Sequence, residues 1–526
     1  MAETAPPWDG YREIPPTLNI TREVLERPVA AGSGTHTAMV YAGGTVTYSE
    51  LLTRVNATAA GLQQLGLQAG DLVLVRMPNG PEFATAFLAA VKLGAVPVLV
   101  NSLLGPAELS AILEQTRPRF AIVEDSRAAA LREVRAQTTI ETTVCVNGSP
   151  QDEIPWKSVA DTGSPDIPTR VTSAQEPAFI VCTSGTTGRP KGIVHAHRWI
   201  IALGDLNRFR LPPTPGDVVM ATGEWSFISA LGHNLLFPLR NGVTCAILHG
   251  RATPENVLQH IGALKVTVLH SVATVYRRML ANQNGLQDNH LASLRCAHST
   301  GEALRAVTYG QWKEQFGCEI YEHYGVSEFQ LVVGQGPRHP VKPGSVGKPA
   351  PGVGIMIVDD NGQRLSRGAM GRTVIATTDP GLFLEYYRDP KRTEEAFRDG
   401  HYDTGDLAYE DDEGYYFIAG RSDDCFKSRG LFIAPTEIEN ALQRHSSVAE
   451  AVVVAEPDAE IGNRVLAFVV LTKGTEESPA LEALLQEGLR NELAHFKIPH
   501  RIIFVTALPR SPVGKILRNK LPITKA

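Results

Sequence analysis

Apolar runs of strand length alternate with helix-length segments through most of this chain. DLVLVRM (71–77) has the pattern of a strand, PEFATAFLAAVKLG (81–94) that of a helix, and VPVLV (96–100) that of a second strand. This order is typical of parallel strands joined by crossover helices. Further apolar runs of strand length lie at 119–125, 178–184, 243–249 and 266–272. The sequence therefore predicts an α/β fold with parallel-rich sheets.

The pattern changes after about residue 340. GSVGKPAPGVGIMIVDDNGQ (344–363) combines glycines and prolines with short alternating segments, which is typical of antiparallel strands joined by turns. DDEG (411–414) predicts a hairpin turn. Further on, 435–445 predicts a helix whose capping box pairs Thr436 with Glu439. We therefore expect a large N-terminal domain over 1–422 and a smaller α+β domain over 423–526.

Length and composition exclude several classes of protein. A chain of 526 residues is too long for one hydrophobic core, and its formal charge of −6 gives no general attraction to nucleic acid or anionic membranes. The acidic, proline-rich start lacks the features of a secretory signal. Its six cysteines are scattered with no CxxC pair, which is typical of reduced thiols in a cytoplasmic protein. We therefore expect a cytoplasmic protein that binds neither nucleic acid nor a membrane.

A loop rich in glycine and hydroxyl groups, TSGTTGRPKG (183–192), follows a predicted buried strand. Such a loop can direct backbone N–H groups and hydroxyls at a phosphate, and Lys191 adds a positive charge. Its spacing is not that of the P-loop, G-x-x-x-x-G-K-[ST], and no G-x-G-x-x-G follows a strand. The loop predicts an anion site of another kind, although a surface linker would have the same composition.

This loop resembles the signature of the acyl-adenylate-forming superfamily, which includes acyl-CoA synthetases, adenylation domains of nonribosomal peptide synthetases and firefly luciferase. Companion motifs occur in the superfamily's order: VTYSEL (46–51), STGEAL (299–304), YEHYGVSE (321–328), YDTGD (402–406), GRSDDCFKSRG (420–430) and LPRSPVGKILR (508–518). The resemblance implies that a carboxylate reacts with ATP to give acyl-AMP and pyrophosphate, and that the acyl group then passes to coenzyme A. It also implies layered sheets and a distorted antiparallel barrel in the N-terminal domain, and a mobile C-terminal domain.

Three residues have implied catalytic roles. Lys191 belongs to the phosphate loop, and Glu328 matches the family's Mg²⁺ ligand, with Ser327 where the family more often has Thr. Lys515 resembles the mobile lysine that bridges the carboxylate and the α-phosphate region during adenylation.

The resemblance also implies a nucleotide site. Tyr324 would lie against adenine, Glu322 would accept a hydrogen bond from its exocyclic amine, and Asp406 with Arg421 would hold the ribose. The implied set is Thr183, Ser184, Gly185, Thr186, Thr187, Gly188, Gly301, Glu302, Ala303, Glu322, Tyr324, Gly325, Ser327, Asp406 and Arg421.

In the family the C-terminal domain rotates between the two half-reactions. The hinge maps to Asp423, and Gly430 would line the tunnel for coenzyme A. Arg429 stands where the family usually has Gly or Ser, and it either faces solvent or contacts coenzyme A or the acyl end. Lys427 matches a second lysine of benzoate-CoA ligase-like members.

The acyl pocket is expected around 224–235, at Ser299–Thr300 and around 326–332. Its implied lining is Phe227, Ile228, Ala230, His233, Val326 and Leu331. Leu331 stands where several benzoate-type enzymes carry His. These residues favour an aromatic acid of the benzoate or 2-aminobenzoate type, which Ser229, His233 or His298 could contact.

Several alternatives stay open. The acid could be a medium-chain or branched aliphatic acid, and the acceptor could be a separate carrier protein. A non-catalytic nucleotide-binding protein is disfavoured because Glu328, Asp406, Arg421 and Lys515 are retained together. A monomer and a homodimer both remain possible.

Overall fold

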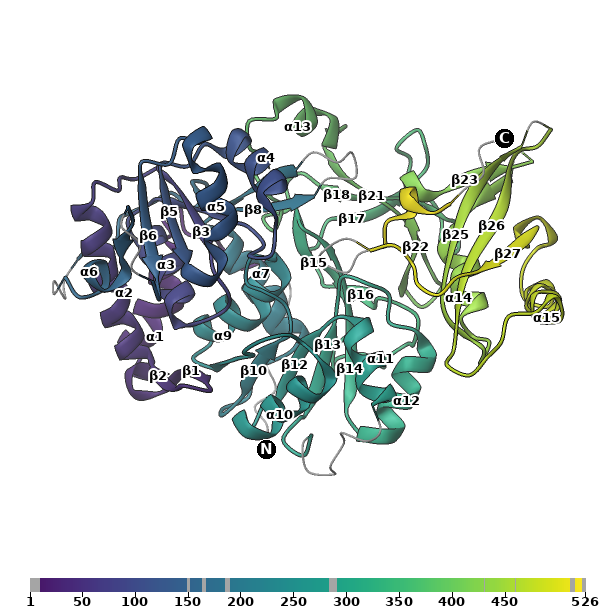
Figure 1. Cartoon of the computed structure of the whole chain (residues 1–526), viewed down its shortest axis with the longest axis horizontal. Coiled ribbons are helices and arrows are strands. Elements are labelled where there is room, and N and C mark those ends of the chain that lie inside the picture. Colours follow the sequence, from purple (N-terminus) through teal and green to yellow (C-terminus); the bar gives the residue numbers. More distant parts are fainter. Residues whose placement is uncertain are drawn as a thin grey trace. The chain divides into compact units, whose positions relative to one another are not determined.

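The chain forms two compact units in a computed structural model (Figure 1). The structure describes residues 10–148, 152–162, 167–184, 190–282, 291–429, 431–458, 460–510 and 516–522. The larger unit comprises Met1–Gly354 with Ala376–Gly400, and the smaller comprises Ile355–Ile375 with His401–Ala526. The domain boundary expected between residues 422 and 423, where the hinge is predicted, stays a prediction.

The first sheet of the larger unit has the strand order β19-β9-β8-β4-β3-β5-β6-β7. In chain order its strands are β3 (Leu72–Arg76), β4 (Val96–Leu99), β5 (Phe120–Glu124), β6 (Thr142–Val146), β7 (Ile154–Pro155), β8 (Pro177–Ser184), β9 (Pro190–Ala196) and β19 (Glu385–Tyr386). The strands from β8 to β7 in this order run parallel, whereas β9 and β19 are antiparallel to their neighbours. The strands predicted at 71–77, 96–100, 119–125 and 178–184 are confirmed.

The second sheet has the order β16-β15-β14-β13-β12-β10-β11-β1-β2. In chain order its strands are β1 (Thr37–Tyr41), β2 (Gly44–Thr47), β10 (Val218–Ala221), β11 (Thr244–Ile247), β12 (Val268–Ser271), β13 (Cys296–Ser299), β14 (Glu319–Val326), β15 (Phe329–Gly334) and β16 (Lys348–Pro349). The strands from β1 to β14 through β11, β10, β12 and β13 are parallel. The parallel-rich α/β architecture predicted from the sequence is confirmed.

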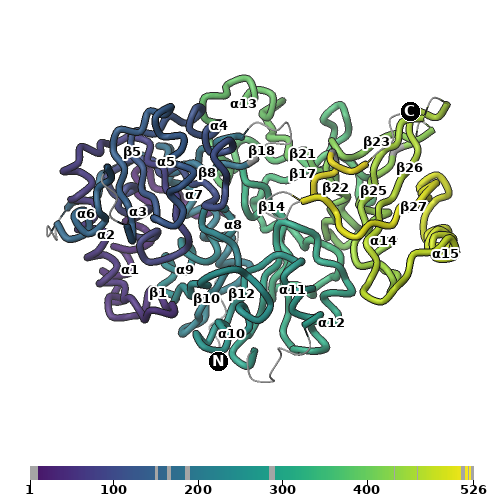
Figure 2. Tube along the Cα trace, in the orientation of Figure 1, coloured from purple at the N-terminus to yellow at the C-terminus, as the bar shows by residue number. Residues whose placement is uncertain are grey.

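Helices cover both sheets. They are α1 (Arg27–Ala30), α2 (Tyr48–Gln64), α3 (Pro81–Lys92), α4 (Pro106–Thr116), α5 (Ala129–Val134), α6 (Trp156–Ala160), α7 (Trp199–Arg210), α8 (Ile228–Ala230), the π-helix η5 (Leu231–Leu236), α9 (Phe237–Arg240), α10 (Pro254–Leu264), α11 (Ala273–Ala281), α12 (Ala306–Phe316) and α13 (Pro390–Ala396). Helices α4 and α5 share a core with β3, β4 and β5, while α10, α11 and α12 share one with the second sheet (Figure 2). No described helix is long and apolar enough to cross a membrane.

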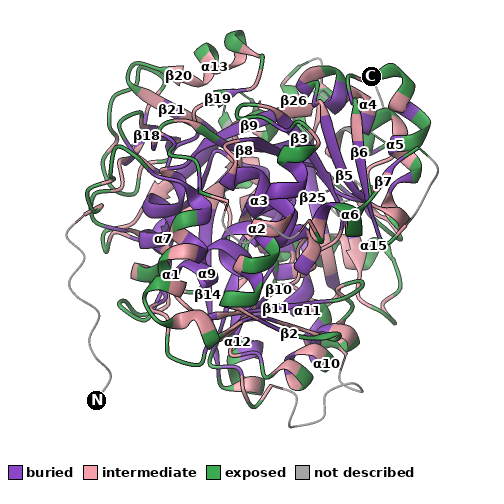
Figure 3. Cartoon of the chain, turned by 90° about the vertical axis from the view of Figure 1, so that its left-hand side faces the viewer, coloured by how far each residue is buried: buried purple, intermediate pink, exposed green. Residues whose placement is uncertain are grey.

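The local sequence explains two of these helices. Helix α2 begins with a capping box in which the Thr47 side chain accepts from Glu50 N and the Glu50 carboxylate accepts from Thr47 N. Helix α3 is rich in Ala and Phe and is buried almost all round, as its colour in Figure 3 shows. Burial between sheet and neighbouring helices therefore accounts for the long apolar run that precedes β4.

The smaller unit is antiparallel at its start. Its strands and helices are β17 (Ile355–Val358), β18 (Gly371–Ala376), β21 (His401–Glu410), β22 (Tyr416–Arg421), β23 (Phe426–Ser428), β24 (Leu431–Ile433), α14 (Pro435–Leu442), β25 (Val448–Asp458), β26 (Gly462–Leu471), α15 (Pro479–Arg490) and β27 (Arg501–Phe504). The DDEG turn joins β21 to β22, with Gly414 at φ +84° and the Asp411 carboxylate accepting from Tyr415 N. Helices α14 and α15 share a core with β25, β26 and β27, which confirms the α+β character of this part.

The predicted capping box at Thr436 is wrong. Helix α14 begins at Pro435, its N-cap is Ala434, and no side chain caps it. The Glu439 carboxylate instead accepts from Val453 N at 2.8 Å and pairs with Arg518 at 2.6 Å. The Glu439 carboxylate, which the local pattern predicts to cap the helix, therefore forms a tertiary ion pair instead.

Candidate active site

Several predicted nucleotide residues of the larger unit lie at or just after the carboxyl ends of parallel strands. Strand β8 ends at Ser184, β12 at Ser271 and β13 at Ser299. In open α/β sheets this edge is where ligands bind. The phosphate loop and the segment that contains Gly301 begin there.

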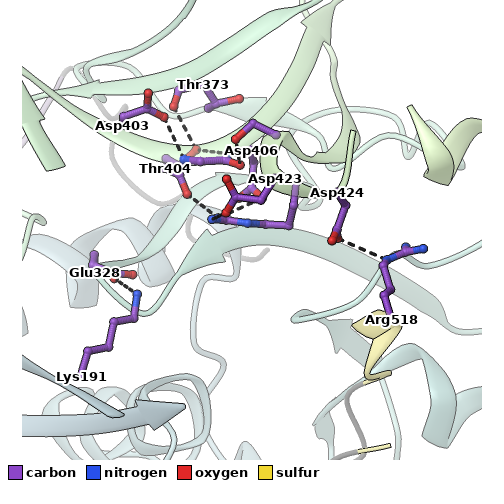
Figure 4. A network of polar contacts seen from close by, with 12 residues as sticks. Lys191, Glu328, Thr373, Asp403, Thr404, Asp406, Asp423, Asp424 and Arg518 are labelled. Atoms are coloured by element: carbon purple, nitrogen blue, oxygen red, sulfur yellow. Dashed lines mark hydrogen bonds and ion pairs between the residues drawn. The ribbon is translucent and has the colours of Figure 1, made fainter. Parts of the chain in front are cut away.

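Lys191 and Glu328 form an ion pair in the larger unit. Lys191 Nζ lies 2.5 Å from Glu328 Oε1, and the Glu328 side chain is only 3% exposed (Figure 4). The Tyr386 hydroxyl donates to the same carboxylate oxygen at 2.7 Å. Two residues that are distant in sequence thus place opposite charges together, and the partly exposed lysine can turn toward an anionic ligand.

The phosphate loop connects β8 to β9. Thr183 is paired with Lys191 and Ser184 with Pro190 across these antiparallel strands. The Thr183 hydroxyl is buried without a hydrogen-bond partner among the described residues. Gly185, Thr186, Thr187 and Gly188 lie outside the described residues. The described ends of the loop therefore place the Thr183 hydroxyl and the Lys191 cation on paired residues of β8 and β9.

The β14–β15 hairpin contains Tyr324, Gly325, Val326 and Ser327. The register shifts between Tyr324 and Val326. A Cβ atom on Gly325 would lie 1.9 Å from the carbonyl oxygen of Gln330. Only glycine allows this close approach of the two backbones. Tyr324 on β14 is buried, whereas Val326 and Ser327 are half-buried.

Glu322 lies in the middle of β14 and is buried. Its carboxylate accepts a hydrogen bond from Leu304 N at 2.8 Å, which ties β14 to the segment after Gly301. Burial raises the pKa of Glu322 to about 8, and the hydrogen bond from Leu304 opposes this shift. The residue expected to face the adenine amine is thus an acid that keeps its proton at neutral pH.

This raised pKa makes folding stability pH-dependent. Because the folded protein keeps the Glu322 proton that the unfolded chain loses above about pH 4.5, the stabilisation present at low pH is lost as the pH rises through 8. Glu322→Gln keeps the acceptor oxygen and removes the titration. We expect the free energy of unfolding of the variant, relative to that of the wild type, to rise by roughly 3 kcal/mol between pH 5.5 and 8.5. Thermal unfolding of both proteins at both pH values measures it. A difference in unfolding free energy that is the same at both pH values would contradict the expectation.

The backbone strip at Gly301, Glu302 and Ala303 is anchored by a side chain. The two carboxylate oxygens of Glu302 accept from Thr274 N at 2.7 Å and from Thr274 Oγ1 at 2.8 Å. Glu302 therefore satisfies the amino end of α11. Its carboxylate is occupied, and the contact of this backbone strip with a nucleotide stays a prediction.

Asp406 and Arg421 face each other in the smaller unit. They pair across β21 and β22, with 3.5 Å between Asp406 Oδ1 and an Arg421 nitrogen. Arg421 also donates to the Thr404 carbonyl at 2.7 Å and contacts the Asp423 carboxylate at 3.3 Å. The predicted ribose and hinge residues are thus neighbours.

The predicted coenzyme A residues are only partly described. Lys427 is exposed on β23, and Arg429 is exposed with φ +53°. A left-handed backbone favours glycine, which gives a physical reason for the small residue that the family usually has at this position. Gly430 and Lys515 lie outside the described residues.

The predicted acyl-pocket segments do come together. Gln330 Nε2 on β15 lies 3.1 Å from the Ser229 carbonyl and 2.7 Å from His233 Nδ1 on η5. Ile228, Ala230, His233 and Leu331 are buried, and Phe227 and Val326 are half-buried. Because side chains alternate along a strand, Leu331 lies on the opposite face of β15 from Gln330.

Sequence reasoning missed three residues of this region: His270, His323 and Gln330. Strands β12, β13 and β14 each bring a histidine to the same face of the sheet, namely His270, His298 and His323. His233 stacks on His270 with 4.1 Å between ring centroids. The repeated pattern LHS, AHS and EHY near the strand ends was the available signal.

By contrast, the two histidines of HAH (195–197) contact other residues of the core. His195 stacks on Phe179 with 5.0 Å between centroids, and His197 Nδ1 accepts from Ile20 N at 3.2 Å.

Lys191 and the buried Glu328 carboxylate lie together in the larger unit. The family model of the AMP-binding enzymes matches residues 26–387, and that of the AMP-binding enzyme C-terminal domain matches 437–515. The chain belongs to this AMP-binding, acyl-adenylate-forming family, and it is an AMP-forming acid–thiol ligase, an enzyme that activates a carboxylic acid with ATP.

Relatives and solved structures match nearly the whole chain. The benzoate–CoA ligase of Thauera aromatica is 34% identical over 97% of this chain and 96% of its own. The mitochondrial acyl-coenzyme A synthetase ACSM3 of Mus musculus is 32% identical over 86% of this chain and 80% of its own. The crystal structure of the anthranilate CoA ligase AuaEII with anthranoyl-AMP has a TM-score of 0.90 and 29% identity, covering 96% of this chain and 97% of that one.

Proposed function

We propose that this enzyme activates an aromatic acid of the benzoate or 2-aminobenzoate type and transfers it to coenzyme A. The observation that carries the proposal is the packing of the α8–η5 segment on β15, which joins the predicted acyl-pocket segments. Ile228 and Ala230 give this region a buried apolar wall. The similarity to ligases for benzoate and anthranilate supports the same class of acid.

The reaction has two steps. A carboxylate oxygen of the acid attacks the α-phosphorus of ATP and pyrophosphate leaves. The thiol sulfur of coenzyme A then attacks the acyl carbon and AMP leaves. Both steps involve anions, so the main task of the protein is to position charges and neutralise them.

The residues of the site fit ATP phosphates and Mg²⁺. The Thr183 hydroxyl is buried without a described partner, and Glu328 offers a buried carboxylate oxygen. Glu328 would hold the Mg²⁺, which supplies charge neutralisation to the phosphates when it is bound. Lys191 would hold the departing pyrophosphate.

The second half-reaction involves the smaller domain. Rotation about Asp423, at the boundary between 422 and 423, would withdraw Lys515 and bring Lys427, Arg429 and Gly430 to the thiol. The contact between Asp423 and Arg421 supports a coupling between the hinge and the ribose-binding residues.

Two alternatives have support of their own. Similarity to ACSM3 favours an aliphatic acid, either medium-chain or branched. A separate carrier protein could replace coenzyme A as acceptor. We place the enzyme in the cytoplasm because its six cysteines are all free. We propose that it is a monomer or a homodimer.

A panel of acids tests the function. Benzoate, aminobenzoates, hexanoate, octanoate and isobutyrate are supplied with ATP, Mg²⁺ and coenzyme A, and thioester formation is measured. We expect the highest kcat/KM for an aromatic acid. A higher value for an aliphatic acid would support the alternative, and pyrophosphate exchange without a thioester would indicate a carrier-protein acceptor.

A further inference from the structure

A second cation lies beside the ion pair of Lys191 and Glu328 (Figure 4). Arg392, in the first turn of α13, has its Cζ atom 5.9 Å from the centroid of the Tyr386 ring. Lys191 Nζ is 5.2 Å from the same centroid, and the Tyr386 hydroxyl donates to Glu328 at 2.7 Å. One buried aromatic ring therefore has a cation from each of two segments next to it, an arrangement that the ring electrons favour.

The backbone explains why these segments meet. Tyr386 pairs with Ile193 across β19 and β9, and Tyr387 N donates to the Gly192 carbonyl at 2.7 Å. Thr393 Oγ1 in α13 accepts from Tyr386 N at 3.0 Å, which holds the first turn of the helix against β19. All of these residues belong to the larger unit. The start of α13 is therefore fixed beside the described end of the phosphate loop.

The charges at this place leave a use for a further cation. Lys191 brings one positive charge, and the Glu328 carboxylate already matches it. The pyrophosphate that leaves in the first half-reaction carries several negative charges. Enzymes that transfer groups from ATP stabilise such charge with cations that are fixed in advance. A second cation beside Lys191 would therefore stabilise the leaving group.

Arg392 can turn toward such an anion. Its Nε lies 3.6 Å from Asp389 Oδ2, and the two side chains are 26% and 33% exposed. Ion pairs exposed to this extent contribute little to stability. Asp389 also caps α13 by accepting from the backbone N of Arg392 at 3.1 Å, and this bond does not involve the guanidinium. The guanidinium can therefore bind a phosphate with two parallel hydrogen bonds while the helix stays capped.

The neighbouring cations have other surroundings. Arg388 Cζ lies 5.6 Å from the centroid of the Tyr387 ring. Lys391 is 85% exposed, with Glu395 at 4.0 Å. Of these three neighbouring cations, Arg392 is the one that contacts the ring next to Lys191.

We propose that Arg392 is a second phosphate-binding residue of this enzyme, whose guanidinium binds the β- or γ-phosphate of ATP and then the leaving pyrophosphate, beside Lys191. Arg392 forms and breaks no covalent bond. It donates hydrogen bonds to phosphate oxygens whose negative charge grows as the bond between the α-phosphorus and the bridging oxygen breaks. The inference concerns ATP, so it holds whichever acid is activated.

The test compares nucleotides that differ only in their phosphates. The Kd values of ATP, ADP and AMP are measured by isothermal titration calorimetry on the full-length protein with Mg²⁺ and without an acid, so that no ATP is consumed. Arg392→Met keeps the length of the side chain against Tyr386 and removes its charge. We expect the Kd of ATP to rise by ~10-fold to 10²-fold, the usual effect of losing a charge-assisted hydrogen bond. The Kd of AMP should not change, because AMP has neither a β- nor a γ-phosphate.

Two variants serve as controls. Lys391→Met removes the same charge from the adjacent, exposed position, and the Kd of ATP should then equal that of the wild type. Arg392→Lys keeps the charge but loses the planar fork, so it should recover part of the lost ATP affinity. Arg392→Gln replaces Arg392→Met if thermal unfolding shows that the latter does not fold.

Three results would overturn the inference. An unchanged Kd of ATP in Arg392→Met would show that the guanidinium binds no phosphate. Equal losses of ATP and AMP affinity would indicate that Arg392 only supports the fold around Tyr386. The same loss of ATP affinity in Lys391→Met would indicate a general effect of surface charge.

The outcome is independent of the acid. ATP binding that depends on Arg392, in a protein that activates no aromatic acid, would support this inference and contradict the proposed function. With an acid that is activated, the KM of pyrophosphate in the exchange reaction should rise in Arg392→Met by a factor similar to that for the Kd of ATP. A KM of pyrophosphate equal to that of the wild type would count against a contact with the leaving group.

Discussion

Lys515→Ala is expected to slow acid-dependent ATP–pyrophosphate exchange by ~10²–10³-fold, the usual cost of losing one preorganised charge at a developing anion. Lys515 is the residue that would neutralise charge between the attacking carboxylate and the α-phosphate. Thioester formation from supplied acyl-AMP needs no such neutralisation and should stay within a few-fold of the wild type. The two half-reactions are measured separately by radiolabelled pyrophosphate exchange and by thioester release.

The chain offers a matched control for this variant. Lys520 is an exposed lysine close by, and Lys520→Ala should leave both half-reactions unchanged. The chain beyond Lys515 is held by Arg518, which donates to Glu439 Oε1 at 2.6 Å and to the Val453 carbonyl at 2.8 Å. Alanine at 515 removes a charge and leaves the Arg518 side chain in the sequence. Equal losses in both half-reactions would show that Lys515 has another role.

Glu328→Gln has the second largest expected effect. The change preserves the size of the side chain but removes its charge, so it loses the ion pair to Lys191 and the proposed anionic ligand for Mg²⁺. We expect pyrophosphate exchange to fall by ~10²-fold, and we expect the Mg²⁺ concentration for half-maximal rate to rise. Both are read from exchange rates over a Mg²⁺ titration.

Tyr386→Phe is the control for Glu328. It removes the 2.7 Å hydrogen bond to the same carboxylate oxygen but leaves the charge. Its exchange rate should fall by about tenfold, less than that of Glu328→Gln, in line with one neutral donor lost to a charged group, and its Mg²⁺ requirement should not change. A Glu328→Gln variant with the Mg²⁺ response of the wild type would refute the metal role, whatever its rate.

The residues predicted for the nucleotide site lie in short, continuous motifs. TSGTTGRPKG and YEHYGVSE each contain several of the expected phosphate or adenine contacts within about ten residues, and backbone loops of that kind depend mainly on local glycine and hydroxyl content. The ion pair between Lys191 and Glu328 joins two such motifs. The motif resemblance implied both residues, but their 2.5 Å contact required the structure.

Side chains with tertiary partners were less predictable. Glu439 follows Thr436 at capping-box spacing, yet it bonds Val453 and Arg518. The spacing of Thr436 and Glu439 indicates only that a capping box is possible. Here the Glu439 carboxylate instead forms an ion pair with Arg518, which is distant in the sequence. Glu302 shows a similar effect, because its motif position suggests a ligand contact while its side chain holds the start of α11.

The sequence by itself determined the α/β architecture and the family, because strand and helix periodicity and loop motifs are local properties. The residues that it implies for the ATP site stay predictions. The tertiary structure alone decided the grouping of the buried histidines. His270, His298 and His323 are neighbours only because β12, β13 and β14 pair in parallel in one register, and a shift of one residue would turn each ring to the other face of the sheet. The predicted acyl-pocket segments pack against such cross-strand neighbours, and their contacts depend on the pairing of strands that lie far apart in the sequence.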